Sequence, residues 1–575
     1  MASAKTDGSR QERPLRLWPG VVAVVVQWAT WYLVPILVPT TAAGYAAALG
    51  GVGGGLIVVL WWLFFSRAAW SERLGAIGLM VVGLAVTSRI VDESVATAGM
   101  GMLLYIAAIP ILSLALVAWA VATRNLSDGV RRVTMVATLL AACGGWALVR
   151  TEGVSATGSH FAWRWSQTAE ERLLAEAGAD PTAGAGSSRA AEVDADWPGF
   201  RGSLRDGVVH GPRIETDWAA SPPVEVWRRP VGPGWSSFAV QGDRLFTQEQ
   251  RGDDEVVVSY DRASGAPVWI HRDAARFWES NGGAGPRGTP TLRGGRVYTF
   301  GATGILNVLE AGDGARVWSR DVAADTGVEI PYWGFSSSPV VVEDVVIVAA
   351  EGKLAAYDLA SGDSRWFGPE GGGGHSSPHL LTLDGTTQVL LLSGTGAVSM
   401  SPDGRLLWEH EWSGYPVVQP AIIGGGDILI NGGEGVGVRR LAVEQGAGGW
   451  TTEERWTSTR LKPYFNDFVI HKGHAIGFDG SILACIDLEN GERKWKGGRY
   501  GQGQLILLAD QDLLLVISEK GELALVSANS ESFTEHARFP AIEGKTWNHP
   551  VLVDDLLLVR NAEEMAAFRL ALTGG

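Results

Sequence analysis

The sequence predicts a membrane α-helical region with five transmembrane helices, followed by an all-β, eight-bladed β-propeller. Three observations lead there: consecutive long apolar segments in the first 150 residues, a tryptophan that recurs every 39 to 49 residues afterwards, and a second periodic series of small polar residues. The expected domains are a transmembrane region at 1–150, a short helix and flexible linker at 151–195, and the propeller at 196–575.

The first part has the pattern of a multi-pass membrane protein. A helix rises 1.5 Å per residue, so about 20 apolar residues cross a hydrocarbon layer of roughly 30 Å. Five segments approach or reach that length: Leu17 to Val38, Tyr45 to Phe65, Leu74 to Val91, Met100 to Ala122 and Val133 to Val149. Lys and Arg gather in the N-terminus and in the second and fourth loops, so the positive-inside rule predicts a cytoplasmic N-terminus. After five crossings, the rest of the chain would lie outside.

Composition restricts the partners of the second part. Residues 151–575 carry 36 Lys and Arg against 56 Asp and Glu, a net charge of −20. Such a surface repels a phosphate backbone, so nucleic acid is not expected as a partner. The only cysteines, Cys143 and Cys485, fall in different parts of the fold and provide no disulfide framework and no thiolate metal site.

The propeller is predicted from two independent repeats. One aromatic follows a turn in each unit: Trp227, Trp269, Trp318, Trp366, Trp408, Trp456, Trp495 and Phe539. One polar residue precedes the first strand of each unit: Ser237, Thr289, Ser338, Ser377, Gln419, Asp467, Gln504 and His549. The eighth unit has three strands before the chain ends, and "VEVWRRP" at 224–230 is expected to close it as a fourth strand, which removes exposed sheet edges.

A turn motif accompanies four of these tryptophans. It reads Asp or Glu, then Gly four residues later, then Trp four residues after the Gly, as in "DLASGDSRW" at Asp358, Gly362 and Trp366. The acidic residue suits a hydrogen bond to the turn's own backbone, Gly supplies a positive φ, and Trp has ~200 Å² to bury. A catalytic Asp is not needed once per blade, so we interpret the motif as a staple between neighbouring blades.

This repeat resembles the tryptophan-docking motif of the PQQ-binding-like (quinoprotein-like) β-propeller family, over residues 196 to 572. "DWPGFRGSLRDG" and "GKTWNHPVLVDDLLLVRNAEEMAAFRL" also look like that family. Two kinds of member differ in function. The membrane-bound PQQ glucose dehydrogenase is an enzyme with five helices before its propeller, whereas the outer-membrane assembly factor BamB is a compact propeller without chemistry. The resemblance implies a bacterial inner-membrane protein with a periplasmic propeller.

The candidate site is the mouth of the propeller channel, where the starts of the first strands converge. If the protein is a quinoprotein, the resemblance implies PQQ and Ca²⁺, with Asp467 as catalytic base and Asn466 and Asp467 as metal ligands. The cofactor-binding candidates are Trp235, Arg287, Thr289, Trp333, Ser338, Ser377, Gln419, Gln504, Trp547 and His549. The alternative interpretation is structural: Asn466 and Asp467 would cap a turn, and the tryptophans would fill the channel.

Two functions follow. The first is a membrane-anchored binding or interaction scaffold in the cell envelope, whose partners are membrane lipid and an envelope protein or a small molecule in the channel. The alternative is a PQQ-dependent dehydrogenase that oxidises an alcohol or sugar and passes electrons to membrane quinone. A sensor is a third possibility, although the sequence offers no cytoplasmic domain to receive a signal.

Overall fold

The computed structural model describes residues 15–37, 41–155, 158–176, 194–433 and 435–573. The chain divides into two compact units: residues 1–166 with 280–282, and residues 167–279 with 283–575. Most of the linker expected before residue 196 lies outside the described residues.

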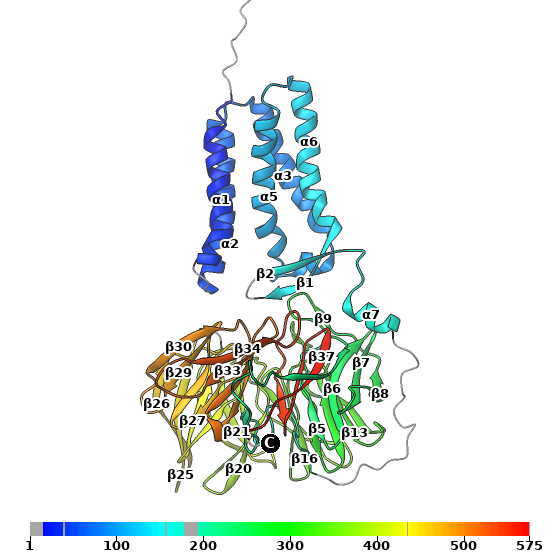
Figure 1. Ribbon diagram of the computed structural model, residues 1–575, viewed down its shortest axis with the longest axis vertical. Helices are drawn as coiled ribbons and strands as arrows, with labels where there is room; N and C mark the ends of the chain where they lie inside the picture. The colour runs from blue at the N-terminus through cyan, green and yellow to red at the C-terminus, as the bar shows by residue number, and fades with distance from the viewer. Residues whose placement is uncertain (1–14, 38–40, 156–157, 177–193, 434, 574–575) are drawn as a thin grey trace, which may run out of the picture. The chain divides into compact units, whose positions relative to one another are not determined.

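The first unit is a helical bundle whose long helices lie side by side (Figure 1). Its helices are α1 (Trp18–Leu37), α2 (Thr41–Leu60) with a π-helical extension (Trp61–Phe65), α3 (Trp70–Ile90), the short α4 (Glu93–Thr97), α5 (Leu103–Ala122) and α6 (Asp128–Gly144). A 3₁₀ turn (Gly145–Leu148) and an antiparallel hairpin of β1 (Val149–Ser155) and β2 (Gly158–Trp163) follow.

Within the described residues, four helices rather than five are long and apolar enough to cross a membrane: α1, α2 with its extension, α3 and α5. The fifth expected segment, 133–149, falls in α6, which has 17 residues and carries Asp128, Arg131 and Arg132 near its start. The chain tightens into the 3₁₀ turn after Gly144 and is extended from Val149. The prediction of five spanning helices is therefore only partly confirmed.

Helix α6 is nevertheless part of the bundle. Arg131 pairs with Glu72 of α3 at 3.1 Å, and both side chains are buried. The Arg131 guanidinium also lies 5.2 Å from the ring of Trp119 on α5. Farther along α6, Cys143 packs closely on Gly83 of α3. A Cβ added to Gly83 would lie 2.9 Å from the sulfur of Cys143. These contacts fix α6 against α3 and α5 along its length.

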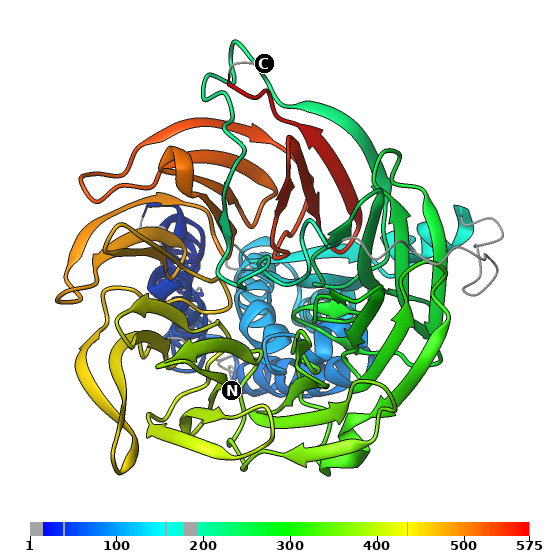
Figure 2. The same ribbon diagram turned by 90° about the horizontal axis from the view of Figure 1, so that it is seen from below.

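The second unit is an eight-bladed propeller of four-stranded antiparallel blades around a central axis, as predicted (Figure 2). Blade 1 consists of β5 (Ala239–Gln241), β6 (Arg244–Arg251), β7 (Asp254–Asp261) and β8 (Pro267–Asp273), and blade 2 of β11 (Thr291–Arg293), β12 (Arg296–Phe300), β13 (Ile305–Glu310) and β14 (Arg316–Asp321). Blade 3 consists of β15 (Val340–Val342), β16 (Val345–Ala350), β17 (Lys353–Asp358) and β18 (Ser364–Phe367), and blade 4 of β19 (His379–Leu383), β20 (Thr386–Ser393), β21 (Gly396–Met400) and β22 (Leu406–Glu411). Blade 5 consists of β23 (Ala421–Gly424), β24 (Asp427–Asn431), β25 (Val438–Gly446) and β26 (Gly449–Ser458), and blade 6 of β27 (Val469–His471), β28 (His474–Asp479), β29 (Ile482–Asp487) and β30 (Arg493–Arg499). Blade 7 contains β31 (Gln504–Leu508), β32 (Leu513–Ile517), β33 (Glu522–Ser527) and β34 (Glu535–Pro540), and blade 8 consists of β35 (Val551–Val553), β36 (Leu556–Arg560), β37 (Glu564–Arg569) and β4 (Val224–Pro230).

The last blade is closed by the strand expected from the sequence. Strand β4 pairs antiparallel with β37, and Trp227 lies opposite Ala567. A short strand β3 (Val208–Val209) adds in parallel to the inner strand β31, so blade 7 has five strands. Hydrogen bonds between the two ends of the propeller chain thus hold the ring shut.

In most blades a tryptophan staples the blade to the next one. The indole N–H of Trp318 donates to the carbonyl of Leu359 in the following blade at 3.2 Å, and its ring covers Gly362, where a Cβ would lie 2.7 Å from it. Asp358 accepts from the backbone of Ser361, as the turn motif predicted. Trp227, Trp269, Trp366 and Trp456 repeat the arrangement, whereas Trp408 donates to Gln388 of its own blade.

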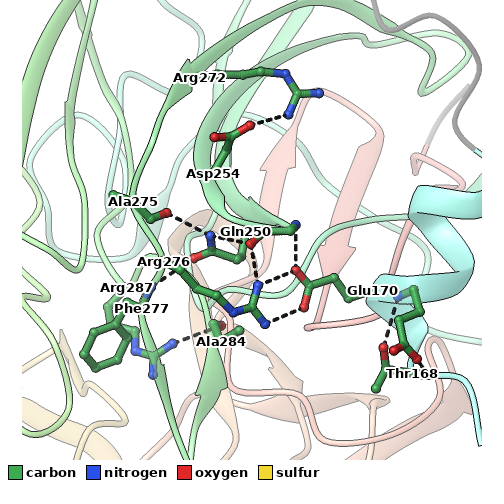
Figure 3. A network of polar contacts seen from close by, with 12 residues as sticks. Thr168, Glu170, Gln250, Asp254, Arg272, Ala275, Arg276, Phe277, Ala284 and Arg287 are labelled. Atoms are coloured by element: carbon green, nitrogen blue, oxygen red, sulfur yellow. Dashed lines mark hydrogen bonds and ion pairs between the residues drawn. The ribbon is translucent and has the colours of Figure 1, made fainter.

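Helix α7 (Ala169–Glu176) is bound to blade 1 within the second unit (Figure 3). Thr168 and Glu171 form a reciprocal capping box at its start, with bonds of 2.7 and 3.0 Å. Glu170 forms a two-pronged ion pair with Arg276 at 2.8 and 3.0 Å and accepts from the backbone N–H of Gly252. Blade 1 therefore holds the segment on which the chain enters the propeller.

Candidate functional site

Eight polar residues, one per blade, lie buried around the propeller axis, where the first strands begin. We call Ser237, Thr289, Ser338, Ser377, Gln419, Asp467, Gln504 and His549 the polar ring; each is at most 6 % exposed. The backbone N–H of each of several ring residues donates to the side chain of the next, at 2.8 to 3.0 Å. Ser237 donates in this way to Thr289, Thr289 to Ser338, Ser338 to Ser377 and Gln419 to Asp467. The structure thus brings together the residues that the periodic series identified, and joins most of them by hydrogen bonds.

The chain's own residues 196–209, the channel segment, cross the middle of the propeller next to the polar ring (Figure 2). Trp197 pairs with Val240 of blade 1, and Val208 pairs with Leu507 of blade 7. Between them, Arg205 donates to the carbonyls of Ser338 and Pro339 in blade 3 at 3.0 and 2.8 Å. The segment therefore ties together inner strands that lie on different sides of the axis.

Arg201 of the channel segment pairs with the only carboxylate of the polar ring. Its Nη1 lies 3.4 Å from Oδ1 of Asp467, and its Nη2 donates to the carbonyl of Phe468. Oδ2 of Asp467 lies 3.2 Å from Nε2 of His549. Burial favours the neutral carboxyl, but the Arg201 charge and the contact with His549 outweigh it and lower the pKa of Asp467 below its usual value. The carboxylate is therefore ionised, and its Oδ1 is already in contact with Arg201 and the backbone N–H of Gln419.

Sequence reasoning missed the two arginines. Arg201 and Arg205 are 2 % and 8 % exposed, and both adopt a positive φ, 60° and 57°. Such backbone is strained for a residue with a side chain and persists only where surrounding contacts hold it. The one signal was a pair of arginines in a glycine-containing stretch ahead of the first blade, "FRGSLRDG".

Aromatic side chains lie on the loops that lead into the polar ring. Trp547 contacts Trp235 and Phe465, with ring centroids 4.7 and 4.8 Å apart. The amine of Lys545 lies 4.3 Å from the Trp547 ring, and burial lowers the pKa of Lys545 to about 8. Gln504 braces these loops by donating to the carbonyls of Phe465 and Trp547.

A second aromatic group surrounds Trp333. His375 and Tyr415 lie 5.9 and 6.2 Å from it, and the Tyr415 hydroxyl is 3.2 Å from Nε2 of His375. Burial, together with the Arg287 charge, lowers the pKa of His375 to about 4, so this imidazole is neutral at pH 7. We call the two groups together the aromatic mouth: Trp235, Trp333, His375, Tyr415, Phe465 and Trp547.

Arg287 holds the loop beside this mouth. It donates to the carbonyls of Trp333 and Gly285 and pairs with Glu279 at 3.3 Å. Its guanidinium also lies against the ring of Phe277 (Figure 3). Burial lowers the pKa of Arg287 to about 10, which still leaves it charged at neutral pH. Its donors are used within the protein, so its observed role is to shape the mouth.

The family model described as outer membrane protein assembly factor BamB matches residues 223–369 and 253–497. BamB of Yersinia pestis is 24% identical over 373 residues, which cover 61% of this chain and 79% of that protein. BamB of Burkholderia pseudomallei is 29% identical over 167 residues, 28% of this chain and 42% of that protein. Together with the eight blades, these matches support a PQQ-like β-propeller family for the second unit, to which residues 223–497 are similar.

The chain is also similar in fold to solved propeller structures. The crystal structure of BamB from Moraxella catarrhalis matches 60% of this chain and 98% of that chain, with 15% identity and a TM-score of 0.44. A quinohemoprotein alcohol dehydrogenase from Pseudomonas putida HK5 matches 66% of this chain and 81% of that chain, with 13% identity and a TM-score of 0.46.

The centre of this PQQ-like propeller does not fit PQQ with Ca²⁺. Calcium takes six to eight oxygen ligands, and the described residues contain no group of three or more Asp, Glu, His or Cys that could hold a metal ion. The Arg201 guanidinium already faces Asp467 and would repel a divalent cation at that carboxylate. Oδ1 of Asn466 accepts from the backbone N–H of Tyr464, as in the turn-capping alternative.

Proposed function

We propose that this protein is a membrane-anchored, PQQ-like propeller that acts as a binding or interaction scaffold in the cell envelope. The observation that carries the proposal is the Arg201–Asp467 pair, since it neutralises the only ring carboxylate and ties the chain's own segment to the polar ring. The matches to BamB, a propeller named as an assembly factor, support the same role.

The proposed location is the bacterial inner membrane, with the N-terminus in the cytoplasm and the propeller in the periplasm. Basic residues in the N-terminus and at Arg67, Arg73, Arg124, Arg131 and Arg132 support this orientation. It requires α6 to act as a fifth crossing. At 17 residues α6 is near the lower limit of length, and its first-turn charges pair or can reach the interface.

Cysteine labelling in intact cells tests this topology. Both native cysteines are buried. A maleimide that cannot cross the inner membrane should modify Asp253→Cys, on an exposed turn of blade 1, and should spare Arg67→Cys, between α2 and α3. Labelling of Arg67→Cys with protection of Asp253→Cys would mean that the propeller is cytoplasmic and would overturn the proposed topology.

The aromatic mouth is the proposed contact region for an envelope protein or a small molecule. It combines large aromatic side chains with the partly buried cations of Arg287 and Lys545, and aromatic and arginine side chains are enriched at the energetic centres of interfaces. A photo-crosslinking residue placed at Tyr415 should give an adduct of one defined mass in cells. A matched residue at Phe367, equally exposed on an outer strand, should give none. Equal crosslinking at both positions would contradict a specific site.

The second candidate function is a PQQ-dependent dehydrogenase with an alcohol or sugar as substrate. The observation that favours it is the aromatic mouth itself, whose flat rings suit a quinone. Purified protein mixed with PQQ and Ca²⁺ is tested for saturable cofactor binding and dye reduction. The scaffold proposal expects neither. Stoichiometric binding with turnover that disappears in Asp467→Asn would establish the dehydrogenase and overturn the scaffold.

A further inference from the structure

An exposed aromatic surface lies on the hairpin that follows α6. Trp163 and Trp165 stack with ring centroids 5.2 Å apart and planes inclined by 8°, yet they are 53 % and 68 % exposed. Phe161 and Leu148 are 45 % and 48 % exposed beside them in the chain. We call these four residues the hairpin patch. Large exposed apolar groups of this kind mark an interaction surface.

The hairpin is fixed in place rather than loosely attached. Ser94, which follows α3, accepts from the backbone N–H of Thr151 at 2.9 Å. Arg164 pairs with Asp92 at 3.4 Å, and the Phe161 ring packs edge-on against buried Trp146 at 5.7 Å. These contacts join β1 and β2 to α4, to its N-cap Asp92 and to the 3₁₀ turn that follows α6.

The position of the patch points to its occupant. Strands β1 and β2 run crosswise to α5 and α6 at the end of the bundle where α6 finishes (Figure 1). The helix sides leading to that end also expose apolar residues, such as Val82 and Ile90 of α3 at 60 % and 51 %. The patch therefore continues the lipid-facing surface of the helices into the plane where headgroups lie. Tryptophan is enriched at that level because one side of its ring is apolar and its N–H favours a wet environment.

We propose that the hairpin patch inserts into the headgroup region of the bilayer and marks the level at which α6 leaves the membrane. This inference rests on the membrane anchoring proposed above and adds to it, because it places the end of α6 at a membrane surface. The occupant is a lipid surface, and a covering protein surface is the outcome that the test must exclude.

Spin labels at single introduced cysteines test the proposal on the full chain in phospholipid vesicles. The label replaces Trp165, with Val82 of α3 as the deep reference and Asp253 of blade 1 as the aqueous reference. Cys143 and Cys485 are buried, and the unsubstituted chain gives their background. Accessibility to oxygen, which concentrates in lipid, is compared with accessibility to a water-soluble nickel chelate.

The oxygen-to-nickel ratio at Trp165→Cys should be several-fold higher than at Asp253→Cys and lower than at Val82→Cys. A ratio at position 165 equal to the aqueous reference, with position 82 still deep, would overturn the interfacial hairpin and leave membrane anchoring intact. Low accessibility to both reagents at position 165 would mean a protein cover and would also overturn it. An aqueous ratio at position 82 would instead refute the anchoring.

Discussion

The guanidinium of Arg201 lies 3.4 Å from the carboxylate of Asp467 at the centre of the propeller, and these side chains are 2 % and 3 % exposed. They are 266 positions apart in the chain, and no regular strand carries Arg201. The pair therefore links the channel segment to the polar ring. Asp467, which the resemblance implied as a catalytic base, is one half of a buried ion pair in this structure.

Removal of one partner should destabilise the propeller strongly. Arg201→Gln leaves a buried carboxylate without its cation, which costs ~3–5 kcal/mol in comparable sites. Thermal unfolding of the purified chain should show a clear fall in the propeller's Tm. The double variant Arg201→Gln with Asp467→Asn should recover part of the loss, because no unpaired charge remains.

The matched control for the Arg201–Asp467 pair is Arg272→Gln, which removes the ion pair between Arg272 and Asp254. The side chains of Arg272 and Asp254 are 39 % and 33 % exposed. Water screens such a pair, so its loss should change the Tm little. Equal effects of Arg201→Gln and Arg272→Gln would contradict a structural role for the buried pair.

Gly362→Ala should be more damaging than Gly385→Ala. The two glycines have nearly the same backbone, φ +77° and +75°, so both variants carry a left-handed penalty of roughly 1–2 kcal/mol. A Cβ at position 385 meets nothing within 4 Å, whereas at 362 it would lie 2.7 Å from the Trp318 ring. Urea unfolding measures the difference, and equal midpoints for the two variants would refute the close contact with Trp318.

Stability should fall as the pH drops below about 6.5, the ordinary pKa of histidine. Burial, reinforced by the charges of Arg205 and Arg201 and opposed by Asp467, lowers the pKa of His379 to about 3 in the folded protein. The unfolded chain therefore binds a proton between pH 6.5 and about 3 that the folded chain does not, so the stabilisation is complete above pH 6.5 and is lost on acidification.

Substitution of His379 isolates this effect. His375, with its pKa lowered to about 4, and buried His549, with a lowered pKa, act in the same direction. Each contributes a slope of up to ~1.4 kcal/mol per pH unit. The Tm of His379→Gln measured between pH 7.5 and 5.5 should fall less steeply than that of the unsubstituted chain. An unchanged slope would show that His379 does not remain neutral.

Glu170→Gln should release α7 from blade 1 without unfolding the propeller. The change removes the two-pronged pair with Arg276, which is partly exposed, and weakens the bond from Gly252, so a local effect is expected. Hydrogen exchange of residues 169–176 should become faster, while the exchange of β6 and β7 stays slow. Glu176→Gln, at the other end of the helix, is the control and should leave the exchange rates unchanged.

The number of blades and their closure were predictable because each blade repeats the same local solution. The turn glycines, the stapling tryptophans and the polar residues before each first strand recur with a period near that of one blade, and "VEVWRRP" is the one repeat unit without a first strand of its own. The staple interpretation of Asp358, Gly362 and Trp366 was likewise a local inference, and the hydrogen bonds of Asp358 and Trp366 agree with it.

The membrane region was predictable where length and apolarity suffice. Helices α1, α3 and α5 lie within four residues of their expected bounds at both ends, but α6 departs from its segment. It begins five residues earlier, at charged Asp128, and ends at Gly144. Hydropathy identifies only the apolar residues from Val133 to Val149. It does not detect the buried Glu72–Arg131 ion pair, which holds the first turn of α6 within the bundle.

By itself, the sequence determined a periodic fold, a preceding run of apolar helices and a set of eight polar residues that had to meet near one axis, because periodicity and hydropathy are local properties of the chain. The contacts that those residues make become apparent only in the folded chain. Arg201 and Arg205 belong to no repeat, and their contact with residues in blades 3 and 6 arises from the path of the channel segment through the closed ring. Charge neutralisation at Asp467 depends on that three-dimensional proximity, which no spacing in the sequence encodes.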